Sequence, residues 1–303
     1  MSDRFPIIEV PTDAARDEEA MGSKSKFWYN DTNLGDCLFK RSRPNTGEDW
    51  SEKVAAELCQ LLGLPHATYE LAVWNEELGT VSPNLLPPKT ALVHGNEILA
   101  GMASSYPKNE RYNVSQHTLS LVLSAVKQPG VQLPPSWEPP PGVGSAIATF
   151  IGYLLLDAWI GNGDRHHENW GFVIPLSRGV PKLAPTYDHA ACLGRELLDA
   201  KRQHHLIQKT VQAYAAKSRS AFYRQVGDPK PMLTFDVFAT VARNYGQSAS
   251  LWLDQLAKIT PTDIAALLHR LPSGRISSDA LEFAHQMLNI NRSRLLHLRE
   301  ELT

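Results

Sequence analysis

The sequence predicts an α+β fold of two lobes, in which a small β-rich N-terminal lobe with one helix precedes a larger α-helical C-terminal lobe. Short β-prone runs separated by turn formers fill the first third of the chain. A proline-rich stretch at residues 128–144 follows, and beyond it apolar residues recur at helical spacing. These changes divide the chain into a loose arm at residues 1–20, an N-terminal lobe at 21–106, a connection at 107–144 and a C-terminal lobe at 145–303.

The composition is that of an ordinary globular protein. A chain of 303 residues with 43% hydrophobic content is long enough to build two cores. The 30 basic and 32 acidic residues nearly cancel, so we expect no general attraction to nucleic acid or to an anionic membrane. The three cysteines show no Cys-x-x-Cys spacing, which argues against a disulfide framework and a structural zinc site. We read no signal peptide and no membrane span, and we expect a cytoplasmic location.

The N-terminal lobe begins with a charged arm and a predicted hairpin. Residues 1–20 have no clear period and are expected to form a loose arm or a single edge strand. Two β-prone runs at residues 26–29 and 37–41 then flank a segment of turn formers at 30–36, which predicts a hairpin. Lys40 lies on the second strand of that hairpin.

One helix follows the hairpin. Apolar residues recur at helical spacing between residues 50 and 62, and Gly63 is a typical helix terminator. Asp49 with Glu52 three residues later resembles a capping box. Further β-like stretches complete the predicted small sheet, at residues 68–74, 80–85 and 90–99.

The C-terminal lobe is predicted to be helical. Thr260 is a good N-cap with Pro261 at the first helical position, so a helix should begin there. Apolar stripes or runs predict the other helices, at residues 145–160, 233–245 and 279–298.

The chemistry centres on Asp164 and Asn169, which lie five residues apart behind an apolar helix. In kinases an aspartate of the catalytic loop orients the acceptor hydroxyl, and an asparagine of the same loop holds a magnesium ion on the phosphates of ATP. The bare spacing is weak, because Asp and Asn are common turn formers. A third residue, Asp188, follows an apolar stretch at 170–174 and completes the order in which kinases present these groups.

Two features of the N-terminal lobe fit the same chemistry. Lys40 follows Leu38-Phe39, so its ammonium could reach the ATP phosphates, although a solvated strand-end lysine is the commoner case. The segment before the hairpin could lay backbone N–H groups and hydroxyls over those phosphates, or be a plain polar loop. Its candidate ATP contacts are Gly22, Ser23, Ser25 and Lys26.

Other charged and polar residues leave alternatives open. Glu52 and Glu57 could each hold the strand lysine, and Glu52 is preferred. His166 is expected to orient the catalytic loop through hydrogen bonds rather than to bind zinc, and the neighbouring tryptophans are expected to pack in the core. The basic runs at residues 201–205 and 217–220 are either solvated faces or contacts for an anionic substrate, and the second run could approach the site.

The two aspartate-containing segments resemble those of HipA-like serine/threonine kinases. In that family the catalytic loop reads Gly-Asn-x-Asp-x-His-x-x-Asn and the metal motif reads Pro-x-Tyr-Asp. Here residues 161–169 read Gly-Asn-Gly-Asp-Arg-His-His-Glu-Asn and residues 185–188 read Pro-Thr-Tyr-Asp. Leu-Phe-Lys at 38–40, and a glutamate ahead of Leu-Gly-Leu at 62–64, extend the resemblance over most of residues 21–195.

The resemblance implies a bilobal protein-kinase-like fold, a compact HipA-type domain that uses ATP and Mg²⁺ and transfers phosphate to an unknown protein acceptor. It implies Asp164 as catalytic base, with Asn169 and Asp188 as magnesium ligands. It also implies Lys40 on the phosphates with Glu52 as its partner. The strand at 91–97 would be the hinge, where Val93 and Gly95 contact adenine.

Two further expectations concern regulation. Ser23 and Ser25 stand where related kinases autophosphorylate, so we expect modification there. An antitoxin or another regulator is a candidate partner, although family toxins carry an additional N-terminal subdomain that helps to engage an antitoxin and only about twenty residues precede the phosphate loop here.

Two alternative functions remain open at the level of sequence. The same Asp-x-x-x-x-Asn and Asp pattern serves kinases of small molecules and phosphoinositides on related folds. A catalytically silent nucleotide-binding interaction module is the third interpretation, against which the joint presence of Lys40, Asp164, Asn169 and Asp188 argues.

Overall fold

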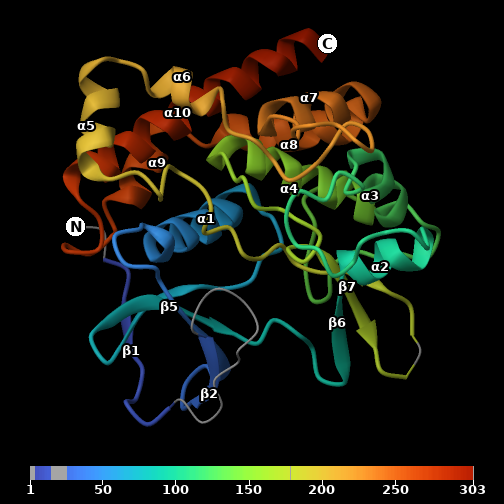
Figure 1. Ribbon diagram of the computed structural model, residues 1–303, viewed down its shortest axis with the longest axis horizontal. Helices are drawn as coiled ribbons and strands as arrows, with labels where there is room; N and C mark the ends of the chain where they lie inside the picture. The colour runs from blue at the N-terminus through green and yellow to red at the C-terminus, as the bar shows by residue number, and fades with distance from the viewer. Residues whose placement is uncertain (1–3, 15–25, 178, 303) are drawn as a thin grey trace.

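The computed structural model describes residues 4–14, 26–177 and 179–302, and in it a β-rich N-terminal part precedes a helical C-terminal part (Figure 1). A five-stranded sheet forms the N-terminal part, in the order β1-β4-β5-β3-β2. Its strands are β1 (Ile7–Glu9), β2 (Lys26–Asp31), β3 (Gly35–Arg41), β4 (Glu70–Trp74) and β5 (Glu77–Pro83). The predicted hairpin is confirmed as the antiparallel pair of β2 and β3.

The first described residues belong to the sheet. β1 pairs in parallel with β4, so it is an edge strand, and the backbone N–H of Val10 donates to Val73 O at 2.9 Å. Phe5 is buried, and its N–H donates to Arg270 O at 2.8 Å. Of the two expectations for residues 1–20, the edge strand is correct for residues 7–9, and the loose arm is wrong for residues 4–14 because apolar side chains anchor them.

Helix α1 (Glu48–Leu62) lies between this sheet and the helices of the C-terminal part (Figure 1). It ends at Gly63, whose φ of 74° is the left-handed conformation that glycine adopts without strain. The predicted capping box is wrong, because the N-cap is Gly47 and makes no side-chain cap. Asp49 and Glu52 are instead occupied by tertiary partners, Arg275 and the backbone after Asp188.

The stretch at 90–99 was predicted as a strand of the N-terminal sheet, and the structure corrects this. Only β6 (Thr90–His94) is a strand, and it pairs with β7 (Gly171–Pro175), which pairs with β8 (Lys182–Leu183), in a separate three-stranded sheet. Helix α2 (Gly95–Met102) follows directly. A side chain at Gly95 would lie 2.3 Å from the Trp170 ring, so only glycine lets the chain turn so close to the residues before β7.

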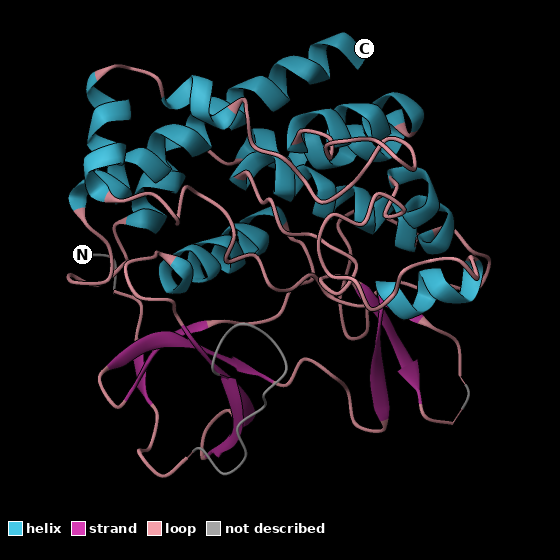
Figure 2. Ribbon diagram, in the orientation of Figure 1, coloured by secondary structure: helices cyan, strands magenta, loops and turns pink. Residues whose placement is uncertain are grey.

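Most of the helices lie on the side of α1 away from the five-stranded sheet, whereas α2 lies beside β6 and β7 (Figure 1 and Figure 2). Four of them confirm predicted helices, α4 (Ala146–Ile160), α7 (Thr234–Asn244), α9 (Pro261–Leu268) and α10 (Ser278–Leu302). Thr260 and Asp263 form a capping box at the start of α9. Four further helices were not predicted: α3 (Leu119–Val126), which falls within the expected connection, α5 (Asp199–Ile207), α6 (Val211–Ala215) and α8 (Gly246–Lys258).

Helix α4 forms the centre of this part and is buried along almost its whole length. Trp159 is fully buried, and its indole N–H donates to Leu288 O of α10 at 3.1 Å. Trp252 of α8 donates to Ala148 O of α4 at 2.7 Å. Within the described ranges, no helix combines the length and the apolar character needed to cross a bilayer. The helix ends at Gly161, where φ is 67°, and the chain enters the segment that carries Asp164.

Candidate functional site

A buried ion pair between Arg165 and Asp157 holds the loop after α4, residues 161–170. Arg165 is 1% exposed, and its Nη2 donates to Asp157 Oδ1 at 2.7 Å while its Nε contacts Oδ2 of the same carboxylate. Asn162 Nδ2 also donates to Asp157 Oδ1, at 2.8 Å, and Arg165 Nη1 donates to Asn169 O at 3.2 Å. A carboxylate and a guanidinium removed from water need such pairing, and here it links the end of α4 to Asn162, Arg165 and Asn169 of the loop.

Within this loop Asp164 and Asn169 are brought together. Asn169 Nδ2 donates to the backbone oxygen of Asp164 at 2.6 Å, across the turn between them. This hydrogen bond fixes the orientation of the amide, so its oxygen, Oδ1, is the atom that can coordinate a metal ion. Asn169 is buried, whereas the Asp164 side chain is 36% exposed and accessible to an acceptor.

Asp188 reaches the site from the segment after β8 and meets the strand lysine of the N-terminal sheet. Lys40 Nζ of β3 lies 3.3 Å from Asp188 Oδ2. Asp188 has a φ of 59°, a left-handed conformation that aspartate tolerates, and its N–H donates to the Tyr69 hydroxyl at 3.0 Å. Burial alone would lower the pKa of Lys40, but the carboxylates of Asp188 and Glu52 outweigh it and raise that pKa above its usual value.

Glu52 of α1 is 2% exposed, and its carboxylate accepts hydrogen bonds from the backbone rather than contacting the Lys40 ammonium directly. Its Oε1 accepts from His189 N at 2.6 Å, and its Oε2 accepts from Ala190 N at 3.1 Å. The two residues follow Asp188, so the carboxylate holds the turn that presents Asp188. Glu57, the other candidate, lies 2.7 Å from Lys53 and 3.4 Å from Arg270. Of the two glutamates, Glu52 is therefore the one that faces the site.

The buried His166 ring lies beside Asp164. Its Nδ1 accepts from Glu168 N at 3.1 Å, which is the kind of backbone hydrogen bond expected of this residue, and its Nε2 is 3.9 Å from Asp164 Oδ1. Arg111 Nε lies 3.2 Å from the same Nε2. Burial, and then the positive charge of Arg111, lower the pKa of His166 to about 3, so the imidazole is neutral at physiological pH.

The expected adenine contacts lie in β6 and at the start of α2. Val93 stands opposite Phe172 of β7, and the Gly95 N–H donates to Trp170 O at 2.9 Å. The hinge candidates are thereby tied to the strand that follows the loop at 161–170. An apolar cluster joins the two parts of the protein nearby, with Ala56, Ala67 and Tyr69 on one side and Val173, Ala184 and Tyr187 on the other.

The phosphate loop is the part of the predicted site that falls outside the described residues. Gly22, Ser23 and Ser25 belong to that segment. Lys26 is the first residue of β2 and pairs in register with Lys40 of β3.

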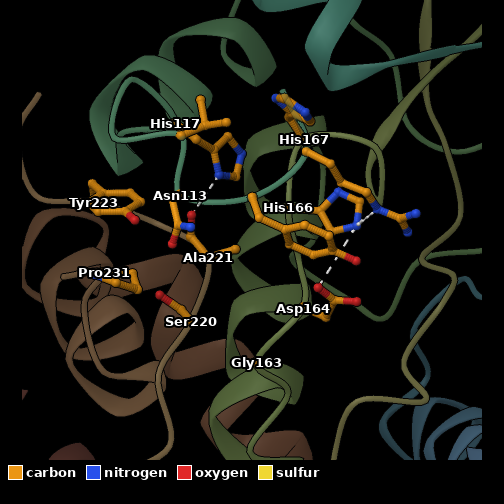
Figure 3. A pocket seen from close by; sticks show the side chains of 13 residues that line it. Asn113, His117, Gly163, Asp164, His166, His167, Ser220, Ala221, Tyr223 and Pro231 are labelled. Atoms are coloured by element: carbon orange, nitrogen blue, oxygen red, sulfur yellow. Dashed lines mark hydrogen bonds and ion pairs between the residues drawn. The ribbon is translucent and has the colours of Figure 1, made fainter. Parts of the chain in front are cut away.

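A cavity of about 150 Å³ opens in front of Asp164 (Figure 3). The loop at 161–170 forms one wall, residues 111–117 a second and residues 220–231 a third. Ser220 and Tyr223 thus face the same space as Asp164 and His166. Of the two basic runs, 217–220 does approach the site, whereas 201–205 lies in α5, where Lys201 is exposed and Arg202 is buried against Gly194 O at 3.0 Å.

Sequence reasoning missed several residues that build the site. Asp157 and Arg165 carried a usable signal, because a carboxylate inside an otherwise apolar helix requires a cationic partner. Arg111, Tyr69 and the wall at 220–231 carried none, since each reaches the site from a distant segment of the chain.

Comparisons with known proteins locate the fold. No family model matches the chain, and no curated protein matches it. Among solved structures, a Helicobacter pylori proinflammatory kinase, CtkA, superposes with a TM-score of 0.77 at 21% identity, covering 98% of both chains. HipA of Shewanella oneidensis, from a complex with HipB and operator DNA, superposes with a TM-score of 0.58 at 12% identity, covering 96% of this chain and 70% of that one. The chain therefore has a kinase-type fold, with a β-rich N-terminal part and a helical C-terminal part.

Proposed function

We propose that the protein is an ATP-dependent phosphotransferase, a HipA-like serine/threonine kinase that transfers the γ-phosphate to a protein hydroxyl. The observation that carries the proposal is the 3.3 Å contact between Lys40 Nζ and Asp188 Oδ2. It joins a lysine of the β-rich part to an aspartate that lies beside the loop of Asp164 and Asn169. A lysine for the phosphates, an acid for the metal and an acid for the hydroxyl are the groups that phosphoryl transfer needs.

The residues fit ATP with magnesium. Mg²⁺ prefers oxygen ligands, and the site offers the Asp188 carboxylate, which is 28% exposed, and the Asn169 amide oxygen. Lys40 is protonated because two carboxylates raise its pKa, so it can bind phosphate oxygens as a cation. A bound magnesium ion would neutralise charge that develops on the phosphate oxygens.

Each protein group then has one task in the transfer. The acceptor hydroxyl lies in the cavity at Asp164, which orients it and takes its proton as the oxygen attacks the γ-phosphorus. A new oxygen–phosphorus bond forms, the bond from the γ-phosphorus to the bridging β-phosphate oxygen breaks, and ADP leaves. Lys40 holds the phosphates during this step. His166 stays neutral and keeps the backbone around Asp164 in place.

A protein acceptor is favoured by the resemblance to HipA-like kinases and by the likeness in fold to a structure described as a kinase and to HipA. Their named activity and partners belong to those proteins.

The test is labelling of a cell extract with γ-³²P-ATP and Mg²⁺ by the wild type and by Asp188→Ala. We expect labelled protein bands with the wild type that Asp188→Ala and Asp164→Ala both lose. Asp254→Ala is the matched control, because this carboxylate of α8 is 46% exposed and pairs with Arg299 far from the site. Label in a small molecule or a lipid would favour the alternative acceptors, and no label above Asp188→Ala would remove the kinase assignment.

Autophosphorylation is tested on the same purified protein. We expect phosphate on Ser23 or Ser25 after incubation with Mg-ATP. Mass spectrometry that finds residues 22–26 unmodified would contradict this.

A further inference from the structure

Two cavities flank the residue before Asp164. The first is the cavity of about 150 Å³ that contains Asp164. The second, which we call the flanking pocket, has a volume of about 480 Å³. It is lined by the segment after Asp188, the first residues of the loop that follows α4, and the basic run at 217–219. Gly163 lines both, so the two cavities meet at its backbone.

Gly163 lies between the two cavities. Its N–H donates to Ala191 O at 3.1 Å, and a Cβ at this position would lie 3.0 Å from Arg219 O. A side chain at this position would press on the Arg219 backbone. In an extended chain, side chains two residues apart point to the same side and lie about 7 Å apart. An extended acceptor segment with its hydroxyl at Asp164 would bring the side chain two residues away to the side of the flanking pocket.

The flanking pocket carries more positive than negative charge. Arg195, Lys217 and Arg219 line it, and among the described lining residues the one carboxylate is Glu196. Arg195 is already paired with Glu48, and Glu196 accepts a hydrogen bond from Tyr214. The two remaining cations are the exposed Lys217 and Arg219, of which Arg219 Nη1 also donates to Pro231 O at 2.6 Å.

We propose that the flanking pocket is a specificity subsite that takes an acidic side chain of the acceptor protein, two residues from the phosphorylated hydroxyl. The inference rests on the proposed function and names the acceptor class, an acidic peptide segment. A carboxylate entering the pocket meets Lys217 and Arg219 on its rim, whereas a lysine there meets like charge. From the sequence alone, the run at 217–220 is either a solvated face or a contact for an anionic substrate. Its position beside Gly163 favours the substrate contact.

The test is a set of serine peptides with an alanine background, in which Glu, Gln or Lys occupies each position within three residues of the serine. With Mg-ATP and the full chain, we expect Glu to exceed Gln in kcat/KM by about fivefold or more at one or two positions, and Lys to fall below Gln. In Lys217→Gln and Arg219→Gln, and in the double variant, the ratio of Glu to Gln should fall towards one. Lys201→Gln, an exposed cation of α5, is the matched control and should keep the wild-type ratio.

The outcomes separate this inference from the proposed function. Phosphorylated peptides with no preference for Glu at any position, or a preference that survives in the double variant, would overturn the subsite. Extract proteins labelled by the wild type while every peptide stays unlabelled would also overturn it and leave the kinase assignment standing. If neither extract nor peptides are labelled above Asp188→Ala, both proposals fall.

Discussion

At the scale of single residues, Glu52 shows how a side chain can serve a site without touching the reacting groups. Both of its carboxylate oxygens accept from backbone N–H groups, those of His189 and Ala190. Its charge also helps to raise the pKa of Lys40. Glu52 therefore supports the lysine and Asp188 together, through one buried carboxylate.

Replacing Glu52 by Gln should weaken both its hold on the backbone after Asp188 and its support of the Lys40 charge. The neutral amide can accept one of the two N–H groups well, and a buried charge-assisted hydrogen bond is lost, which we expect to lower the free energy of unfolding by ~2 kcal/mol. Urea unfolding measures this change, and phosphate transfer should fall as well. Glu57→Gln is the comparison, since Glu57 pairs with Lys53 and Arg270 instead. An equal loss of transfer in the two variants would contradict the role given to Glu52.

Lys40 is the second residue whose role can be tested directly. Lys40→Met removes the cation that the proposal places on the phosphates, and we expect kcat to fall by about 10²-fold or more. The measurement is labelled phosphate transfer at saturating ATP. Lys26→Met, at the position paired with Lys40 across the hairpin, should cost less. The reverse order would assign the phosphates to Lys26.

At the scale of elements, α1 is fastened to the helical part along its length. Asp49 Oδ2 accepts from Arg275 Nη1 at 2.8 Å, with both side chains buried, and Arg275 Nη2 donates to Ala72 O of β4 at 2.7 Å. Phe5 lies between Lys53 and Arg270, with ring distances of 4.7 and 4.2 Å to the two cations. Because α1 also carries Glu52, these contacts fix the position of the site relative to the helices.

The buried pair of Asp49 and Arg275 should be important for stability. Arg275→Met leaves the Asp49 carboxylate buried without its cation, and we expect the free energy of unfolding to fall by about 3 kcal/mol. Thermal or urea unfolding measures it. The double variant Arg275→Met with Asp49→Leu should recover part of the loss, since it removes the unpaired charge. A double variant less stable than Arg275→Met would show that the charge was not the cause.

At the scale of the whole molecule, buried neutral histidines should make the protein sensitive to acid. Burial lowers the pKa of His117 from its usual 6.5 to about 4, helped by the nearby His167. The ring packs on Trp170, whose indole N–H donates to His117 Nε2 at 3.2 Å, and its Nδ1 donates to Ala221 O at 2.9 Å. The neutral ring thus connects the end of the loop at 161–170 to the cavity wall at 220–231.

The sign of the pH effect follows from that shift. The folded pKa lies below the unfolded one, so the unfolded chain binds the proton more readily, and the His117 contribution is complete above about pH 6.5 and lost as the pH falls towards about 4. Between pH 7 and 5 we expect a loss of about 2 kcal/mol from this residue. Urea unfolding across that range measures it. His117→Gln should be less stable at pH 7 but less dependent on pH, while the exposed His297→Gln should match the wild type.

The sequence by itself determined the features that depend on near neighbours in the chain. The β2–β3 hairpin follows from turn formers between β-prone runs, and α9 from a capping box with proline behind it. The β-rich then helical order follows from the change of hydrophobic period. The order of Lys40, Asp164, Asn169 and Asp188 was equally visible, because spacing within a motif is a property of the chain.

Only the tertiary structure decided which distant groups meet. The partner of Glu52 lies 137 residues away, and that of Asp49 226 residues away, so a pattern typical of a local capping box was misleading. β6 joined β7, and Gly95 lets the chain turn against Trp170 at the end of that pair; no local propensity indicates this pairing. The basic run at 217–219 was ambiguous until packing placed it beside Gly163. Hydrophobic periods and caps are encoded over a few residues, whereas the partner of a buried charge depends on the fold that buries it.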